Sequence, residues 1–198
     1  MSDVLKNIQT RRSVRSYRDE KIPDEIVREL LKVGTLAPNG NNFQGLRFVV
    51  MENREKMDRY AAVAREMSKT NFIGIRDAAT DPSQKEAMDK MVKMLSNPEF
   101  DIFYSAPLVI FIFTAPGTLT PVEDASLAAE NMFLYANSIG IGSCWIGFGK
   151  ALQFYPDFMA EAGVPPGHTL VAPLVFGYPK KGLPESHRKE PQVFKWIK

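Results

Sequence analysis

Cysteine and histidine are scarce in this sequence, which has one cysteine and two histidines among 198 residues. A single cysteine excludes an intramolecular disulfide and any multi-cysteine zinc or iron–sulfur centre built within one chain. Two isolated histidines do not make a metal site, so we expect no metal. The cysteine, Cys144, lies between Ser143 and Trp145 in a strand-like segment, and we interpret its thiol as a packing group rather than a nucleophile.

Long apolar runs and a large net charge are also missing. The longest apolar run, Ala106 to Ala115, is interrupted by Pro107 and falls short of the roughly 20 residues needed to span a bilayer. The segment from Met1 to Ile8 has polar residues between its apolar ones and lacks the apolar region of a signal peptide. A net charge of +2 is too small to favour nucleic acid as a partner. We therefore expect a cytoplasmic protein that binds neither membranes nor nucleic acid.

The order of apolar patterns predicts a single domain over residues 1–198, since no internal repeat or linker interrupts it. Helices and strands neither alternate strictly nor separate cleanly, which favours an α+β layered sheet over a doubly wound parallel one. No G-x-G-x-x-G motif joins a strand to a helix, which argues against a Rossmann nicotinamide enzyme. The first predicted helix is short, is capped by Ser2 and precedes the arginine cluster, with Val4, Leu5 and Ile8 facing inward. The other predicted helices cover residues 23–34, 54–97 with a turn near Asp81, 124–139 and 155–162. The predicted strands cover 46–51, 108–114 and 170–178, and residues 141–148 are predicted to form a glycine-rich turn and a short strand.

Arginines are concentrated near the N-terminus. Arg11, Arg12 and Arg15, with Ser13 between them, offer three guanidinium groups and a hydroxyl within five residues. Guanidinium groups bind phosphate through paired hydrogen bonds, and a hydroxyl can complete the shell. The pattern alone leaves two interpretations open, a phosphate site and a solvated basic face.

A loop dense in proline, asparagine and glycine runs from Pro38 to Gln44. Its amide side chains and accessible backbone suit the edge of a flat heteroaromatic ring. The same composition is typical of ordinary turns, so the loop alone leaves both interpretations open.

Three segments taken together resemble the nitroreductase family. They read RRSVRSY from Arg11, APNGNNFQ from Ala37, and AAEN from Ala128 followed by GIGSCWIG from Gly140, in the order and spacing of that family. The resemblance implies a three-layer sandwich, with a central, mainly antiparallel sheet flanked by helices, in an intertwined homodimer that binds one FMN in each of two interface sites. The tail, about residues 179–198, has too few apolar residues to pack alone, so we expect it to wrap on the partner subunit.

The resemblance also implies roles for individual arginines. Arg11, Arg12, Ser13 and Arg15 match the N-terminal FMN motif of the family, with Arg11 toward the phosphate and Arg15 toward the pyrimidine edge. Arg188 matches the C-terminal arginine that binds the phosphate.

Two further motifs match residues around the flavin ring. The loop that the second subunit lays against the ring corresponds to Pro38, Asn39, Gly40 and Asn42. The strand end whose backbone amide approaches flavin N5 corresponds to Ile146, Gly147 and Phe148.

The implied function is an FMN-dependent oxidoreductase. NAD(P)H as co-substrate reduces the flavin by hydride transfer through N5 and leaves, and a nitroaromatic, a quinone or another flat aromatic acceptor then enters. A cation near the pyrimidine edge favours the reduced, anionic flavin, and an amide donor orients N5, so no catalytic side chain is expected.

The chain departs from many relatives at Gly45-Leu46, where they have Pro-Trp, and at Gly147, where one branch has glutamate. Two alternatives therefore stay open. One is a specialised relative, such as a reductive dehalogenase or a flavin-fragmenting oxygenase, that differs in residues 54–103, and the other is a flavin-binding module without turnover.

Overall fold

The computed structural model describes residues 2–183, 185 and 188–198. Within them the α-helices are α1 (Asp3–Thr10), α2 (Asp24–Thr35), α3 (Arg54–Ala78), α4 (Pro82–Leu95), α5 (Pro121–Ser138) and α6 (Pro156–Glu161). The 3-10 helices are η1 (Gly40–Asn42) and η2 (Gly147–Phe154), and the strands are β1 (Leu46–Met51), β2 (Leu108–Thr114), β3 (Gly142–Trp145) and β4 (Thr169–Gly177).

The four strands form one antiparallel sheet in the order β1-β2-β4-β3. All residues of β2 are buried, as its almost wholly apolar sequence predicts for a strand covered on both faces. A register shift between Ile112 and Phe113 interrupts the pairing of β2 with β4 near one end. Every pairing between these four strands is antiparallel.

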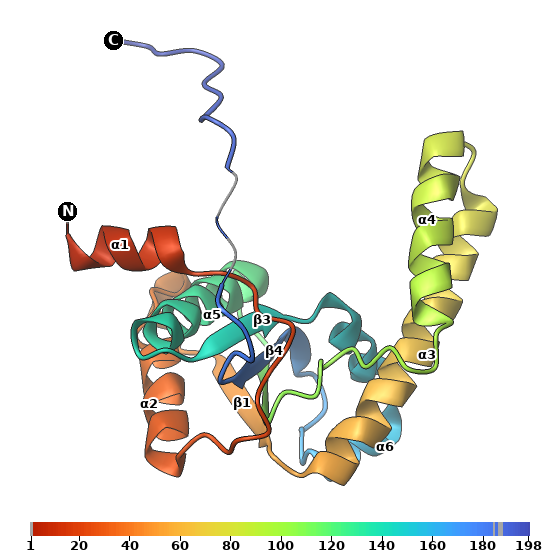
Figure 1. The fold of residues 1–198 in the computed structure, drawn as a ribbon, viewed down its shortest axis with the longest axis horizontal. Coiled ribbons are helices and arrows are strands. Elements are labelled where there is room, and N and C mark those ends of the chain that lie inside the picture. The colour runs from red at the N-terminus through yellow and green to blue at the C-terminus, as the bar shows by residue number, and fades with distance from the viewer. Residues whose placement is uncertain (1, 184, 186–187) are drawn as a thin grey trace.

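Alternate side chains of β2 enter two separate cores, which makes the fold three layers thick. Val109, Phe111 and Phe113 pack with residues of α3, η2 and α6, whereas Ile110 and Ile112 pack with α2 and α5. Figure 1 shows α2 and α5 on one side of the sheet and α3 and α6 on the other. The three-layer α+β fold predicted from the motifs is confirmed.

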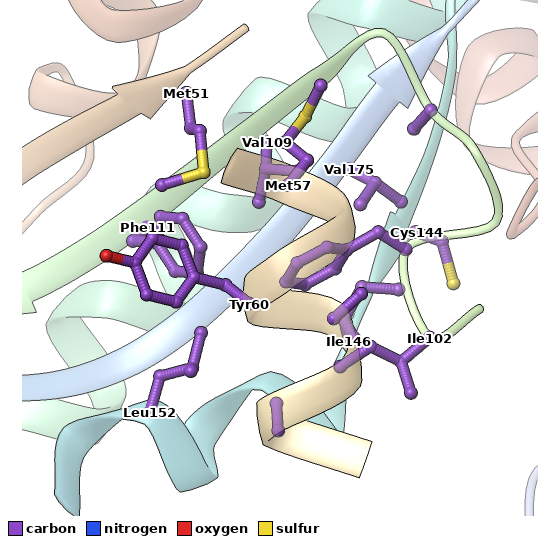
Figure 2. Close-up of a cluster of buried hydrophobic side chains, with 14 of the residues drawn as sticks. Met51, Met57, Tyr60, Ile102, Val109, Phe111, Cys144, Ile146, Leu152 and Val175 are labelled. Atoms are coloured by element: carbon purple, nitrogen blue, oxygen red, sulfur yellow. The ribbon is translucent and has the colours of Figure 1, made fainter. Parts of the chain in front are cut away.

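The core between α3 and the sheet is rich in aromatic and sulfur-containing side chains. Figure 2 shows Tyr60 of α3 lying near Phe111 of β2, with Met51 and Leu152 at the edges of the cluster. The Phe111 ring also meets that of Phe158 edge to face, with the centroids 4.9 Å apart. These contacts hold α3, η2 and the sheet as one packed unit.

Helices α3 and α4 form a hairpin, and the outer part of this hairpin stands away from the sheet (Figure 1). The Asn53 side chain accepts a hydrogen bond from Lys56 N at 2.9 Å and so caps α3. Asp81 caps α4 by accepting from Ser83 N at 2.8 Å, and Pro82 occupies the first turn, where its missing N–H costs nothing. The predicted helical segment with a turn at Asp81 is confirmed.

Helix α1 forms as predicted but its apolar side chains do not face inward. The Ser2 hydroxyl accepts from Leu5 N at 3.3 Å, which is the predicted cap. Val4, Leu5 and Ile8 are 68%, 44% and 51% exposed, so the expectation that they enter the core is wrong. Helices α2 and α5 already cover that face of the sheet, and α1 packs on α5 from outside.

The tail residues 188–198 have neither helix nor strand and extend away from the body (Figure 1). Val193, Phe194, Trp196 and Ile197 are all largely exposed. None of the helices in the described part of the chain combines the length and apolar character needed to cross a membrane.

Candidate functional site

The arginine segment that follows α1 lies along β3. Ser13 and Ser143 form an isolated parallel bridge, in which Val14 N donates to the Ser143 carbonyl at 2.9 Å. The buried hydroxyl of Tyr17 donates to the Val14 carbonyl at 2.5 Å. These bonds hold the backbone from Ser13 to Tyr17 beside the strand that leads to Gly147.

Three of the arginines predicted from sequence meet at one cavity. Arg11 and Arg12 line it together with Arg188 from the tail, and its volume is about 620 Å³. Glu130 of α5 lies in the same cavity, with its Oε1 3.4 Å from Arg11 Nε. Glu130 belongs to the AAEN segment of the family resemblance, but it was not predicted as a site residue, because only the tertiary contact brings it to the arginines.

Arg15 lies close enough to Tyr104 and Cys144 for its charge to act on both groups. Burial raises the pKa of Tyr104, and the positive charge of Arg15 opposes that rise. Burial likewise raises the pKa of Cys144, with Arg15 again opposing it. The thiol therefore stays protonated at neutral pH, in agreement with its interpretation as a packing residue.

The turn that carries Tyr104 is held in an unusual conformation. Tyr104 and Ser105 have φ of 55° and 52°, in the left-handed region that side chains disfavour. The Asp101 carboxylate accepts from Ser105 N at 2.6 Å, and the Arg54 guanidinium donates to the Ala106 carbonyl at 2.9 Å. The bond from Asp101 is local, but the bond from Arg54 comes from a distant helix and cannot be foreseen from the residues around the turn.

The short strand predicted within 141–148 is β3, and Ile146, Gly147 and Phe148 lie beyond its end. The pairing of β3 with β4 ends at Trp145 because the next residue of β4 is Pro173. Its carbonyl accepts from Ile146 N at 2.8 Å, but proline has no N–H to return, and the chain turns into η2.

Gly147 is the first residue of η2, and its backbone is open to an approaching group. The N–H at this position has no acceptor within the helix, as at any helix start. A Cβ built on Gly147 would meet no atom within 4 Å. From Ser143 to Gly147 the chain covers at most about 13 Å, so the arginine segment and this free amide lie along one edge of the molecule.

The loop that contains Pro38, Asn39, Gly40 and Asn42 is anchored to the start of α5. Gly40 N donates to Asp124 Oδ1 at 3.0 Å, and Thr120 Oγ1 donates to the same oxygen at 2.8 Å. Asp124 is 2% exposed, and its Oδ2 has no hydrogen-bond partner among the described residues. A Cβ at position 40 would clash with Thr120 Oγ1, so a larger residue there would displace this hydroxyl from its hydrogen bond to Asp124.

The rest of this loop adopts left-handed backbone conformations and bonds to itself. Asn41, Asn42 and Gln44 have φ of 53°, 52° and 53°, which asparagine tolerates better than most residues. Asn39 Oδ1 accepts from Gln44 N at 2.8 Å. The loop is exposed, so its unusual shape comes from these bonds and from its anchor on α5.

The anchor separates this loop from the arginine cavity of the same chain. Asp124 and Glu130 lie about 9 Å apart along the axis of α5 and about 120° apart around it. Thus the structure brings together Arg11, Arg12 and Arg188 at one cavity. It also places Ser13 and Arg15 beside β3, the strand that leads to Ile146, Gly147 and Phe148. It does not bring Pro38, Asn39, Gly40 and Asn42 to the arginine cavity within one chain.

Comparison with known proteins places these features in a family. A relative from Archaeoglobus fulgidus, named as a candidate NADH dehydrogenase/NAD(P)H nitroreductase, is 29% identical over 181 residues, which cover 91% of this chain and 87% of the relative. An iodotyrosine deiodinase from Thermotoga neapolitana is 26% identical and covers 91% of this chain and 90% of its own length. The crystal structure of a nitroreductase with bound FMN from Bacteroides fragilis is 25% identical, covers 100% of this chain and 99% of that one, and superimposes with a TM-score of 0.77. The model of the Nitroreductase family matches residues 8–178, and the chain therefore belongs to this family.

Proposed function

We propose that this protein is an FMN-dependent oxidoreductase that uses NAD(P)H to reduce flat aromatic acceptors, such as nitroaromatics or quinones, by a ping-pong reaction. The observation that carries the proposal is that Arg11, Arg12 and Arg188 converge on one cavity. The free amide of Gly147 lies along the same edge of the molecule. The bound FMN named for the Bacteroides fragilis structure and the name of the Archaeoglobus relative also support it.

The arginine cavity suits the phosphate end of FMN. Arg11 and Arg188 would bind the phosphate oxygens through charged hydrogen bonds, with Arg12 beside them and the Ser13 hydroxyl next along the chain. Glu130 offsets part of this positive charge, because it lies 3.4 Å from Arg11. A phosphate group would therefore compete with Glu130 for the Arg11 guanidinium.

Arg15, Ile146, Gly147 and Phe148 would hold the flavin ring. Bound FMN would supply an N5 atom that takes a hydride from NAD(P)H and delivers it to the acceptor. The Gly147 amide would donate a hydrogen bond at N5, and the absence of a Cβ lets the ring approach. Arg15 would balance the negative charge that reduction places on the pyrimidine edge.

The site is complete in this proposal only when two copies form an intertwined homodimer. Pro38, Asn39, Gly40 and Asn42 would reach the partner's flavin, because their anchor keeps them from the cavity of their own chain. The exposed apolar residues of α1 and of the tail, about 179–198, would be covered by the partner, and residues 1–198 would act as one FMN-binding domain. Light scattering that finds a monomer with tightly bound FMN contradicts the dimer.

The affinity for FMN tests the phosphate site. We expect Arg11→Ala and Arg188→Ala each to weaken FMN binding by about 1.5 to 3 kcal/mol, the usual worth of a hydrogen bond to a charged group. Riboflavin, which lacks the phosphate, provides the comparison ligand, and Arg28→Ala on α2 is the matched control because Arg28 does not line the cavity. Equal losses for FMN and riboflavin mean that these arginines do not bind the phosphate.

Rapid mixing separates an enzyme from a module that binds flavin without turnover. The flavin-loaded protein is mixed anaerobically with NADH or NADPH, and then with a quinone or a nitroaromatic. We expect loss of the flavin absorbance at a catalytic rate in the first step and its return in the second. A flavin that stays oxidised with both nucleotides contradicts the NAD(P)H-dependent activity.

A specialised dehalogenase is the second candidate. The likeness to the Thermotoga neapolitana iodotyrosine deiodinase supports it, as does α3, which lies in the predicted region of difference and contributes residues to a cavity beside Gly147. Supplying a halogenated phenol as acceptor and measuring released halide tests this candidate directly. Halide release much faster than nitro or quinone reduction favours it.

A further inference from the structure

A second cavity of about 560 Å³ opens between α3 and η2, and Gly147 lies in its wall. Met67 and Phe72 of α3 and Phe148 and Phe154 of η2 give it a largely apolar lining. The cavity is therefore large enough for a small aromatic molecule, which would lie between the two helices next to the free amide of Gly147.

The aromatic wall of this cavity is held in place from behind. The rings of Phe72 and Phe148 meet edge to face with centroids 5.9 Å apart, and Phe100 packs against Phe148 at 6.4 Å. Ser68, 6% exposed, donates a hydrogen bond from its hydroxyl to the Phe148 carbonyl at 3.1 Å. A ring that enters the cavity would thus meet a preformed apolar surface at Phe72 and Phe148.

The cavity also carries a positive charge. Among the described residues that line it, Lys150 is the charged one, and no carboxylate of the described chain lies within ion-pair distance of its ammonium group. The Asn71 side chain adds an amide donor to the same lining. A cation without a carboxylate partner, beside apolar walls, favours a ligand that combines a flat ring with a negative group.

We propose, on the basis of the proposed function, that this cavity is the acceptor site and that it selects aromatic acceptors bearing an anionic group such as a carboxylate. Lys150 and Asn71 bind the anionic end, the phenylalanine walls hold the ring, and the reducible group lies toward Gly147. For a nitro acceptor, NADH gives up a hydride, solvent supplies one proton, and the nitro group becomes a nitroso group with loss of water. The anionic substituent takes no part in this two-electron step.

The kinetic test compares 4-nitrobenzoate with 4-nitrobenzamide, which has the same shape without the charge. We expect Lys150→Met to lower kcat/KM for 4-nitrobenzoate about threefold to fivefold, mainly through KM, because one charge–charge attraction to an exposed lysine is lost. For 4-nitrobenzamide we expect less than about a twofold change, and Lys150→Arg should keep most of the preference for the carboxylate. Added salt should reduce the preference in the wild type.

Lys32→Met, on α2 and outside the cavity, controls for the loss of a surface lysine. Equal losses for both acceptors, or no loss, overturn the assignment. Lys150 could instead bind the phosphates of the nicotinamide nucleotide, so flavin reduction by NADH is measured separately. A slower reduction step with unchanged reoxidation by both acceptors also overturns the proposal.

Equilibrium binding gives a readout that needs no turnover. Calorimetry of benzoate and benzamide with the flavin-loaded protein should show tighter binding of benzoate, and Lys150→Met should abolish the difference. If benzoate binds in this Lys150-dependent way but NAD(P)H does not reduce the flavin, the proposed function fails and the anion-binding cavity stands. If the flavin turns over but benzoate and benzamide bind alike, the cavity assignment fails alone.

Discussion

The carboxylate of Asp124 holds the loop with Asn39, Gly40 and Asn42, so we expect its removal to weaken FMN binding although it lies away from the phosphate cavity. Asp124 Oδ1 accepts two hydrogen bonds, from Gly40 N at 3.0 Å and from Thr120 Oγ1 at 2.8 Å. Hydrogen bonds to a charged group contribute about 1.5 to 3 kcal/mol each. These are the bonds that keep the loop in its left-handed conformation.

The net loss of loop stability in Asp124→Ala is smaller than the summed free energies of these two hydrogen bonds. The buried Oδ2 has no partner among the described residues, and burying an incompletely paired carboxylate costs several kcal/mol, which the alanine relieves. We therefore expect the loop to lose about 2 kcal/mol of stability and the Kd for FMN to rise by up to about 30-fold. Asp124→Asn keeps an acceptor oxygen and should change the Kd by less than about fivefold.

Hydrogen exchange by mass spectrometry and FMN titration on the same preparations measure this effect. The matched control is Glu123→Ala, which removes an exposed carboxylate from the same first turn of α5. We expect faster exchange in residues 38–45 for Asp124→Ala only. Unchanged exchange and unchanged FMN affinity would refute the reasoning, and a lower Tm with an unaltered loop would show that Asp124 stabilises α5 alone.

Three further predictions follow from single side chains. Gly147→Val should leave Tm nearly unchanged, because a Cβ there meets no atom within 4 Å. The same change should slow flavin reduction about 10- to 1,000-fold in single-turnover assays. A lower Tm with normal flavin reduction contradicts the assignment of the Gly147 amide to N5. Glu130→Gln should tighten FMN binding about threefold to tenfold at low salt, without affecting riboflavin, because it frees Arg11 from a carboxylate 3.4 Å away; weaker FMN binding argues that Glu130 orders the arginine instead. The Lys56 ammonium group holds the pKa of Glu161 down at about 2. The stabilisation from this carboxylate is therefore complete above pH 4.5 and is lost as the pH falls toward 2. Glu161→Gln should lower Tm at pH 7, and the difference in Tm from the wild type should shrink over that acid range.

Elements with strong local patterns were predictable from the sequence. Strand β2 is apolar throughout, and α2 carries an apolar stripe with the helix period after Pro23, so both were recovered with nearly correct bounds. The short strand predicted within 141–148 forms as β3, but the residue at which it ends depends on Pro173 in another strand. The prediction that Val4 is buried was also wrong, because the amphipathic pattern of α1 cannot show which surface covers its apolar side.

The sequence by itself determined the family, the layered α+β fold and the motifs of the candidate site, because these depend on residue types at short spacing along the chain. Only the tertiary structure decided which of those residues meet. Arg188 reaches Arg11 through the path of the tail, and Glu130 joins them because α5 packs beside that segment. Asp124 fixes Gly40 across a long sequence separation. Such contacts arise when distant segments are packed around a shared core, and local residue patterns carry no record of that packing.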